Sequence, residues 1–296
     1  MRRAWRSTSS IVQYMGSTQV LAKLRAERAQ PRTDVWIGAG GVIPFMVAKK
    51  EGLLEPYQSP EFRFGETLGN IQTRDREWYW VGAYVLALGW AYNTKKLKDE
   101  EVPTDVEALT TSQWKGQVEM ANPEASGTAA LFILSTLDRY RRSGQGEDAG
   151  WKLLEKFAAN VKRFPESGGA PAQDAAKGDI LVGVSFDQQA NLLKVKGEPV
   201  EFKLPKQAVV LVDPVALVKG APNPEGARKF IDFLLSQKGQ SLLQLDAYMS
   251  MRSDVPPPKV SRYTIDDYIK ASTTVDFEWA AENFDRVVRR FRDLTR

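Results

Sequence analysis

The stretch Trp114–Leu137 constrains the fold of this chain most, because it reads as a strand, a turn and a helix in direct succession. A strand-like run, Gln117–Met120, leads into a proline-containing turn. Ser126, Gly127 and Thr128 follow, and apolar residues at helical spacing come next. The first N–H groups of a helix lack intrahelical partners and carry partial positive charge. Small hydroxyl residues there can hold a phosphate, phosphonate or carboxylate, or they can simply cap the helix.

Two further loops have the same composition at a strand-to-helix transition. Ser17 and Thr18 follow Gly16 at the start of an amphipathic helix. Ser167 and Gly168 precede a short helix and a strand. In open α/β sheets, such loops gather at the carboxyl ends of the strands, where ligands bind. The three loops together predict a cleft that holds a small polar ligand through backbone amides and hydroxyl groups.

Composition narrows the class of protein. The 296 residues suffice for two domains, and they include no cysteine and no histidine. The chain therefore has no disulfide or thiol nucleophile, and it lacks the usual general base and the commonest metal ligand. These absences argue against an enzyme and against a metal site. The net charge of +4 is mild, and we find no basic stripe with stacking aromatic residues, so no nucleic-acid partner is predicted.

Strands and helices alternate along the chain, which favours an α/β fold. The expected strands are Ile11–Met15, Asp34–Ile37, Trp78–Trp90, Gln117–Met120, Ile180–Phe186 and Val209–Val218. The expected helices are Leu21–Arg28, Pro44–Glu51, Ala129–Arg142, Ala149–Asn160, Gln188–Lys196 and Pro224–Leu235, with two more in Ile265–Leu294.

Two apolar runs, Trp78–Tyr92 and Val209–Val218, are long for single strands. We interpret them as the segments that pass from one lobe to the other and back, crossing near Ala87–Tyr92 and Gln207–Asp213. The predicted division is a first lobe of residues 1–92 plus 208–296 and a second lobe of residues 93–207. The alternative is that both runs are central strands of one large sheet.

These segments resemble a known family, the substrate-binding proteins of ABC importers with the type II periplasmic fold. Within it, the chain is most similar to the branch of ferric-iron, 2-aminoethylphosphonate and hexose-phosphate binding proteins. The similarity spans Ile11 to about Pro256. The segments that carry it are Gly16–Glu27, Asp34–Gly41, Ala48–Tyr57, Gly89–Leu97, Trp114–Ala129, Ala175–Ala190 and Val218–Gln240. Their order and spacing are specific for the family and much less so for the ligand.

The resemblance implies a two-lobed protein that closes by a hinge around a solute in the cleft between the lobes. The solute is expected to be small and anionic or polyhydroxylated, with a phosphonate or a sugar phosphate favoured. The partner is an ABC permease in the membrane, the location is periplasmic or extracellular and membrane-associated, and the protein is a monomer without cofactor. The expected ligand-binding residues are Ser17, Thr18, Gly40 and Gly41 in the first lobe and Ser126, Gly127, Thr128, Ser167, Gly168 and Asp187 in the second.

Two departures from the family pattern bear on the ligand. Iron-binding relatives carry adjacent tyrosines in the second lobe, whereas Ser185–Gln189 contains none, so ferric iron is the less favoured alternative. Hexose-phosphate relatives carry a His-Asp pair near Asp187 and an acidic residue in the next turn, where this chain has Lys206. Lys206 either attracts an anion or is a solvated loop lysine. Asp187 either accepts hydrogen bonds from the ligand or caps its helix.

The start of the chain also departs from the pattern. Relatives carry a signal peptide, a first strand and a first helix before the segment that matches Ile11–Thr18. Here the charged start Met1–Arg6 has no apolar continuation, and we expect a shortened start that lacks those elements. An alternative from another class is an α/β transferase acting on a phosphorylated substrate. Such an enzyme needs a general base, for which carboxylate, lysine and tyrosine side chains remain, and a metal-binding carboxylate cluster, which the sequence does not offer at suitable spacing.

Overall fold

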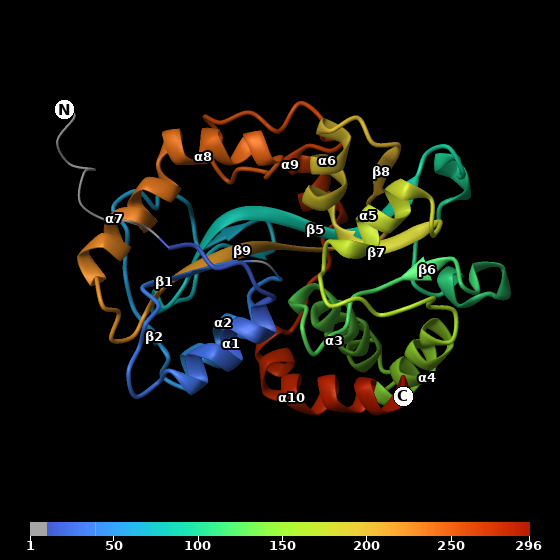
Figure 1. Cartoon of the computed structure of the whole chain (residues 1–296), viewed down its shortest axis with the longest axis horizontal. Coiled ribbons are helices and arrows are strands. Elements are labelled where there is room, and N and C mark those ends of the chain that lie inside the picture. Colours follow the sequence, from blue (N-terminus) through green and yellow to red (C-terminus); the bar gives the residue numbers. More distant parts are fainter. Residues whose placement is uncertain (1–10, 39) are drawn as a thin grey trace.

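The computed structural model describes residues 11–38 and 40–296, so the charged start Met1–Arg6 lies outside the described residues. Figure 1 shows the elements in two groups, joined by two long strands that pass through the middle of the molecule. The mixture of helices and strands confirms the α/β class. Among the described helices, none combines the length and the apolar character needed to cross a bilayer.

The two long strands are β5 (Val81–Asn93) and β9 (Val209–Val218), which pair antiparallel. All 13 residues of β5 are buried, as expected for a strand covered on both faces. Up to Leu88, β5 pairs with β9. From Leu88 onward, its other edge pairs with β7 (Val182–Phe186), and from Trp90 onward β8 (Val200–Lys203) takes the place of β9. The partners of β5 thus change within the crossing predicted near Ala87–Tyr92.

The remaining strands extend this sheet on both sides. The strands β1 (Val35–Ile37) and β2 (Leu54–Glu55) pair antiparallel with β9, and β6 (Val118–Glu119) pairs parallel with β7. The result is one seven-stranded sheet whose main order is β1-β9-β5-β7-β6. A separate hairpin is formed by β3 (Thr67–Leu68) and β4 (Ile71–Gln72). Because β5 belongs to both halves of this sheet, the division at residues 92 and 208 stays a prediction.

Helices cover both halves of the sheet (Figure 1). The α-helices are α1 (Ser17–Ala26), α2 (Ile43–Lys50), α3 (Gly127–Arg142), α4 (Glu147–Ala158), α5 (Ala170–Lys177), α6 (Asp187–Val195), α7 (Pro224–Leu235), α8 (Gln237–Leu243), α9 (Ile265–Ala271) and α10 (Phe277–Leu294). Short 3-10 turns are η1 (Asp99–Glu101), η2 (Ala108–Thr110), η3 (Ser112–Trp114) and η4 (Gln244–Asp246). Side-chain caps mark the beginnings of two of these helices. Asn223 caps α7 ahead of Pro224, and Asp276 caps α10.

The last helix, α10, contacts both groups. Its buried face is apolar and comprises Ala280, Ala281, Phe284, Val287, Val288 and Phe291. On one side, Glu282 pairs with Lys50 of α2, and on the other, Arg286 pairs with Glu147 of α4. Exposed ion pairs of this kind add little stability, so the apolar face carries most of the attachment. Figure 1 shows α10 running below α3 and α4, with its start near the junction of the two groups.

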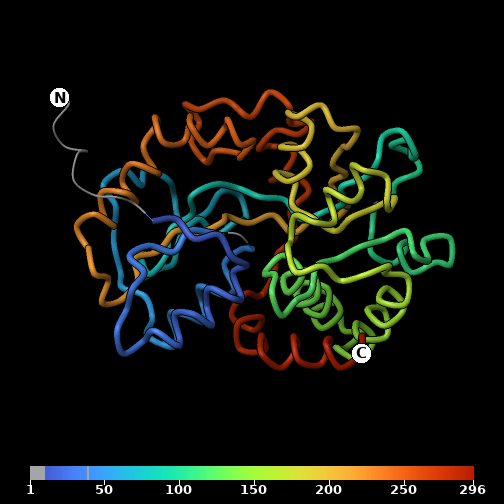
Figure 2. Tube along the Cα trace, viewed as in Figure 1, coloured from blue at the N-terminus to red at the C-terminus, as the bar shows by residue number. Residues whose placement is uncertain are grey.

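The segment before α10 forms backbone hydrogen bonds with the second crossing segment, near Ala208. The N–H of Ala208 donates to the carbonyl of Ala271, and the N–H of Thr273 donates to the carbonyl of Ala208, each at 2.9 Å. Figure 2 shows this part of the trace descending past the crossing strands to α10. The chain therefore passes the junction of the two groups a third time.

One expected strand is wrong. Residues 11–16 have no regular structure, and the side chains of Ile11, Val12 and Tyr14 are 86%, 67% and 94% exposed. A short apolar run becomes a strand only when a neighbouring strand supplies hydrogen bonds, and none of the described strands pairs with it. The bounds of β9 and α7, by contrast, are those expected from the sequence. The short strand β8 was not anticipated.

Gly89 tests the packing at the point where β5 changes partners. A Cβ atom on Gly89 would lie 2.5 Å from the carbonyl oxygen of Lys203 and 2.6 Å from the ring of Phe202. Gly89→Ala should therefore lower the free energy of unfolding by about 1–3 kcal/mol through overpacking. Gly65→Ala is the control, because its nearest atom is 3.3 Å away. Urea unfolding measures both, and equal midpoints would contradict this account of the junction.

Candidate functional site

Three of the predicted loops touch where the two groups of elements meet. A Cβ atom on Gly127 would lie 2.2 Å from Ser17 Oγ and 3.1 Å from the Cα of Gly40. One on Gly16 would lie 1.8 Å from the carbonyl oxygen of Ala125. Backbone approaches this close leave no room for side chains, which accounts for the glycines. The loops at residues 16–18, 40–41 and 126–128 are thus in direct contact.

The fourth loop joins them through Gly168. A Cβ atom there would lie 2.8 Å from Ser126 Oγ and 2.9 Å from Thr128 Oγ1. Ser167 is exposed, and its hydroxyl accepts a hydrogen bond from the N–H of Gly169 at 3.3 Å. We call residues 16–18, 40–41, 126–128 and 167–168 the loop cluster. The structure therefore brings together nine of the ten residues predicted to bind ligand, and Asp187 is described below.

The loop cluster lies at the starts of helices. Ser17 begins α1, Gly127 begins α3, and Gly168 lies two residues before α5. Ser126 occupies the N-cap position of α3, yet its side chain makes no capping hydrogen bond to the helix. The hydroxyl of Thr18 is buried and has no hydrogen-bond partner among the described residues. The capping interpretation thus does not hold for Ser126.

Three hydroxyl side chains of the cluster are buried. Ser17, Ser126 and Thr128 are 1%, 3% and 7% exposed. Hydroxyl groups both donate and accept, and they sit here beside the N–H groups at the helix starts. In a region of low dielectric constant, such donors interact strongly with a negative charge. The arrangement can bind anionic oxygens, and it offers no nucleophile-and-base pair.

A buried carboxylate that the sequence analysis missed holds one of these loops. Asp213 of β9 is 1% exposed, and its Oδ1 accepts hydrogen bonds from the N–H groups of Gly40 and Gly41 at 3.2 and 2.9 Å. Its Oδ2 accepts one from the hydroxyl of Tyr84 at 3.0 Å. Gly40 and Gly41 have φ of +143° and +89°, which suits glycine. The signal was present, because Asp213 is the one charged residue in the apolar run of β9.

Asp187 is the first residue of α6, and it is also buried. It contacts the other long strand, β5. Its Oδ1 accepts a hydrogen bond from the N–H of Ala87 at 2.9 Å, and its Oδ2 accepts one from the hydroxyl of Tyr268 at 2.7 Å. Burial raises the pKa of Asp187 to about 6 in spite of these hydrogen bonds. The carboxylate thus ties α6 and α9 to β5. Its expected role toward ligand stays a prediction.

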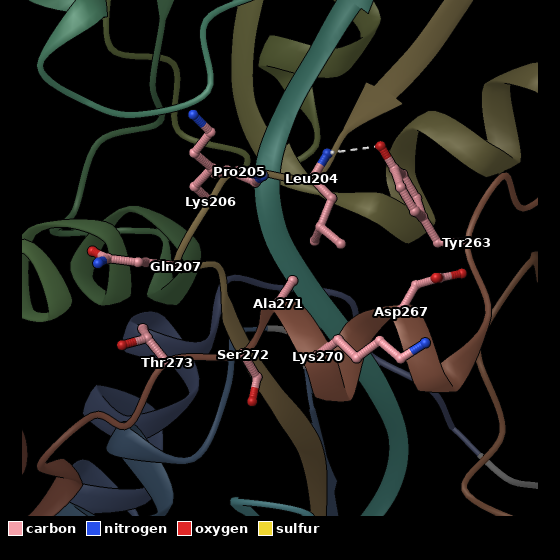
Figure 3. Close-up of a pocket in the computed structure, with 10 residues that line it drawn as sticks. All are labelled: Leu204, Pro205, Lys206, Gln207, Tyr263, Asp267, Lys270, Ala271, Ser272 and Thr273. Carbon is pink, nitrogen blue, oxygen red and sulfur yellow. Dashed lines mark hydrogen bonds between the residues drawn. The ribbon is translucent and has the colours of Figure 1, made fainter.

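Lys206 lies apart from the loop cluster. It lines a pocket of about 560 Å³ with neighbours that include Gln207, Tyr263 and Asp267 (Figure 3). A second pocket of about 600 Å³ also includes Lys206, together with Trp90 and Phe132. Neither lining includes a residue of the loop cluster or Asp187. We therefore base the candidate site on the close contacts of the loops and not on these pockets.

Metal coordination finds no support in the described part of the chain. Within residues 11–38 and 40–296, no three acidic side chains are placed so that they could hold an ion. Glu119 and Asp174 come together, but both pair with Arg163. Burial raises the pKa of Glu119.

The raised pKa of Asp187 predicts a pH dependence. The folded-state pKa of about 6 exceeds the ordinary 3.8, so ionisation of Asp187 opposes folding. The cost appears as pH rises from about 4 to about 6, reaches about 3 kcal/mol and stays constant above. In Asp187→Asn this loss should be absent, since the amide is neutral and of similar shape. Urea unfolding of both proteins between pH 4 and pH 8 measures it. A constant difference across that range would refute a raised pKa.

Comparisons with known proteins agree with this architecture. A family model described as bacterial extracellular solute-binding protein matches residues 44–271. An uncharacterized protein of Haemophilus influenzae is 32% identical over 236 residues, which cover 77% of this chain and 65% of that protein. The putative 2-aminoethylphosphonate-binding periplasmic protein of Salmonella typhimurium is 28% identical over 280 residues, 90% of this chain and 75% of that protein. The chain thus spans about two thirds to three quarters of these relatives.

Solved structures extend the comparison to the fold. The periplasmic binding protein AfuA of Actinobacillus pleuropneumoniae, with fructose-6-phosphate bound, has a TM-score of 0.85 and 26% identity. The match covers 98% of this chain and 91% of AfuA. The ferric binding protein of Campylobacter jejuni, at a TM-score of 0.75 and 18% identity over 94% of this chain and 88% of that one, shows likeness of fold alone. The fold is therefore the expected two-lobed one.

Proposed function

The chain belongs to the family of bacterial extracellular solute-binding proteins, and we propose that it binds a small phosphorylated or phosphonate solute at the loop cluster. Proteins of this family are periplasmic or extracellular, bind small solutes and work with ABC permeases. We propose the same location and partner class for this chain, which would act as a monomer and as a carrier that leaves its ligand unchanged.

The main support for the proposal is that several helices begin in or next to the loop cluster. The helices α1 and α3 begin inside the loop cluster, and α5 and α2 begin within three residues of it. Each start presents N–H groups without intrahelical partners and the positive end of a helix dipole. Several starts that face one region make an anion site. The buried, unpartnered hydroxyl of Thr18 adds a donor in the same place.

The ligands named for similar proteins have matching chemistry. One relative is named for 2-aminoethylphosphonate, and AfuA holds fructose-6-phosphate. Both compounds carry a tetrahedral phosphorus centre with anionic oxygens. The loop cluster consists of amides and hydroxyl groups, so it suits the phosphate or phosphonate group that the two compounds share. It makes no demand on the rest of the ligand.

Ferric iron is the second candidate, because iron uptake protein A1 of Synechocystis is 26% identical over 250 residues, 78% of this chain and 64% of that protein. Ferric iron prefers several anionic oxygen ligands. The described residues provide no group of three carboxylates, and Asp187 already accepts two hydrogen bonds from the protein. We therefore predict that equilibrium dialysis against ferric citrate yields no stoichiometric iron complex. A coloured complex with one iron per chain would overturn this prediction.

A ligand screen tests the proposal directly. Thermal unfolding is followed with 2-aminoethylphosphonate, fructose 6-phosphate, inorganic phosphate and an uncharged hexose. A phosphorus-containing ligand should raise the melting temperature, because it binds only the folded state. The hexose should not. Stabilisation by the hexose alone, or by none of the four, would contradict a phosphate or phosphonate site.

A substitution at Thr128 tests whether the solute binds at the loop cluster. Thr128→Val removes a hydroxyl that lies at the start of α3 and keeps the shape of the side chain. Affinity for the phosphorus ligand found in the screen should fall by about 1–3 kcal/mol, the range for a hydrogen bond to a charged group. The matched control is Thr136→Val on the same helix, where the hydroxyl donates to the carbonyl of Phe132. Calorimetry with equal affinities for both variants would leave Thr128 as a helix-start residue only.

A further inference from the structure

Two adjacent glutamines at the start of α6 lie between the two groups of elements. Gln188 is 3% exposed, and its Nε2 donates to the backbone carbonyl of Asp246 at 2.7 Å. The helix α6 packs on β8, β5 and β7, whereas Asp246 ends η4, which follows and contacts α8. Figure 1 shows α8 with the group around β1 and α6 with the group around β7. The bond from Gln188 to Asp246 therefore joins the two groups.

The second glutamine connects this bond to the loop cluster. The Nε2 of Gln189 donates to the Oε1 of Gln188 at 2.7 Å. The Oε1 of Gln189 lies against the backbone of Gly169, where a Cβ atom would be 2.5 Å from it. The preceding residue, Gly168, lies against Ser126 and Thr128. A continuous series of contacts thus runs from a carbonyl in one group to the ligand loops of the other.

We propose that Gln188 and Gln189 form an interlobe latch, which holds the lobes closed and positions the 167–169 loop in the closed state. The function of the latch as an aid to solute binding rests on the function proposed above. Gln188 and Gln189 are positioning residues in this scheme, because the latch acts through the loop at residues 167–169.

A primary amide meets both demands at Gln188. Its NH₂ group donates to a carbonyl oxygen, while its own oxygen accepts from a second amide. A carboxylate would place oxygen against oxygen at Asp246, and a lysine or arginine could not accept from Gln189. A buried donor that loses its acceptor is costly, so the bond resists opening as long as the region stays dry.

The latch acts on one conformation only. When the lobes rotate apart, the Asp246 carbonyl moves away from Gln188, and water satisfies both groups. A contact made only in the closed state shifts the equilibrium toward that state. Its loss should reduce the closed fraction without ligand, and it should speed ligand dissociation about tenfold, as expected for one net hydrogen bond. Association should change little, because ligand enters the open form.

The test reads lobe closure independently of ligand. Since the chain contains no cysteine, cysteines introduced at the exposed positions Lys229 of α7 and Lys152 of α4 can carry a fluorophore pair. Single-molecule energy transfer then gives the closed fraction. Gln188→Glu keeps the acceptor for Gln189 and removes the donor to Asp246, so it should lower that fraction. Gln173→Glu is the charge-matched control on the exposed face of α5 and should match the wild type.

Kinetics with 2-aminoethylphosphonate and fructose 6-phosphate complete the experiment. Gln188→Glu should raise the dissociation rate about tenfold. Gln189→Leu leaves the Asp246 bond intact, so it should weaken binding and keep the closed fraction of the wild type. If Gln188→Glu does not fold, Gln188→Met, which is nearly isosteric and apolar, carries the same expectation.

The outcomes separate the latch from the proposed function. An unchanged closed fraction in Gln188→Glu overturns the latch, even when ligand dissociates faster. A lowered closed fraction in a protein that binds neither compound supports the latch and refutes the proposed ligand class. A lowered fraction in Gln173→Glu as well would assign the effect to added charge and would also overturn the latch.

Discussion

The pairing of β5 with different strands along its length is the constraint on which the rest of the structure depends. A strand of 13 buried residues exceeds the usual length by about a factor of two. It must satisfy its backbone groups with strands from both halves of the molecule, because a buried and unpaired N–H group is costly. The junction therefore lies around Leu88 to Trp90, where β7 joins one edge of β5 and β8 replaces β9 on the other.

Two buried carboxylates reinforce the junction. Asp187 accepts from the backbone of β5, and Asp213 extends from β9 to the N–H groups of Gly40 and Gly41. A carboxylate transferred from water needs such partners to offset its lost hydration. Each one thus links a crossing strand to an element that carries or adjoins the loop cluster: α6 in one case and the 40–41 turn in the other.

The sequence predicted most of the long elements, because hydrophobic periodicity and caps act locally. It also predicted which loops would gather, since Gly, Ser and Thr at strand-to-helix transitions mark ligand loops. It failed at Ile11–Met15, where a strand needs a partner that local pattern cannot specify. It missed Asp213 and the contacts of Gln188, because their roles depend on residues more than 50 positions away in the chain. A polar residue within an apolar run marked Asp213, but only the structure shows what it holds.

The composition of the loop cluster has a consequence for specificity. Residues 16–18, 40–41, 126–128 and 167–168 include no lysine or arginine, so in the proposed site only helix starts and hydroxyl groups would meet anionic oxygens. Peptide N–H groups do not titrate near neutral pH, and the field of a helix start falls off within its first turn. In the proposed site, such a set of donors would recognise a compact tetrahedral anion and would not distinguish what that anion is attached to. If the proposed site holds, discrimination between one phosphorylated solute and another would come from side chains of the cleft outside the loop cluster.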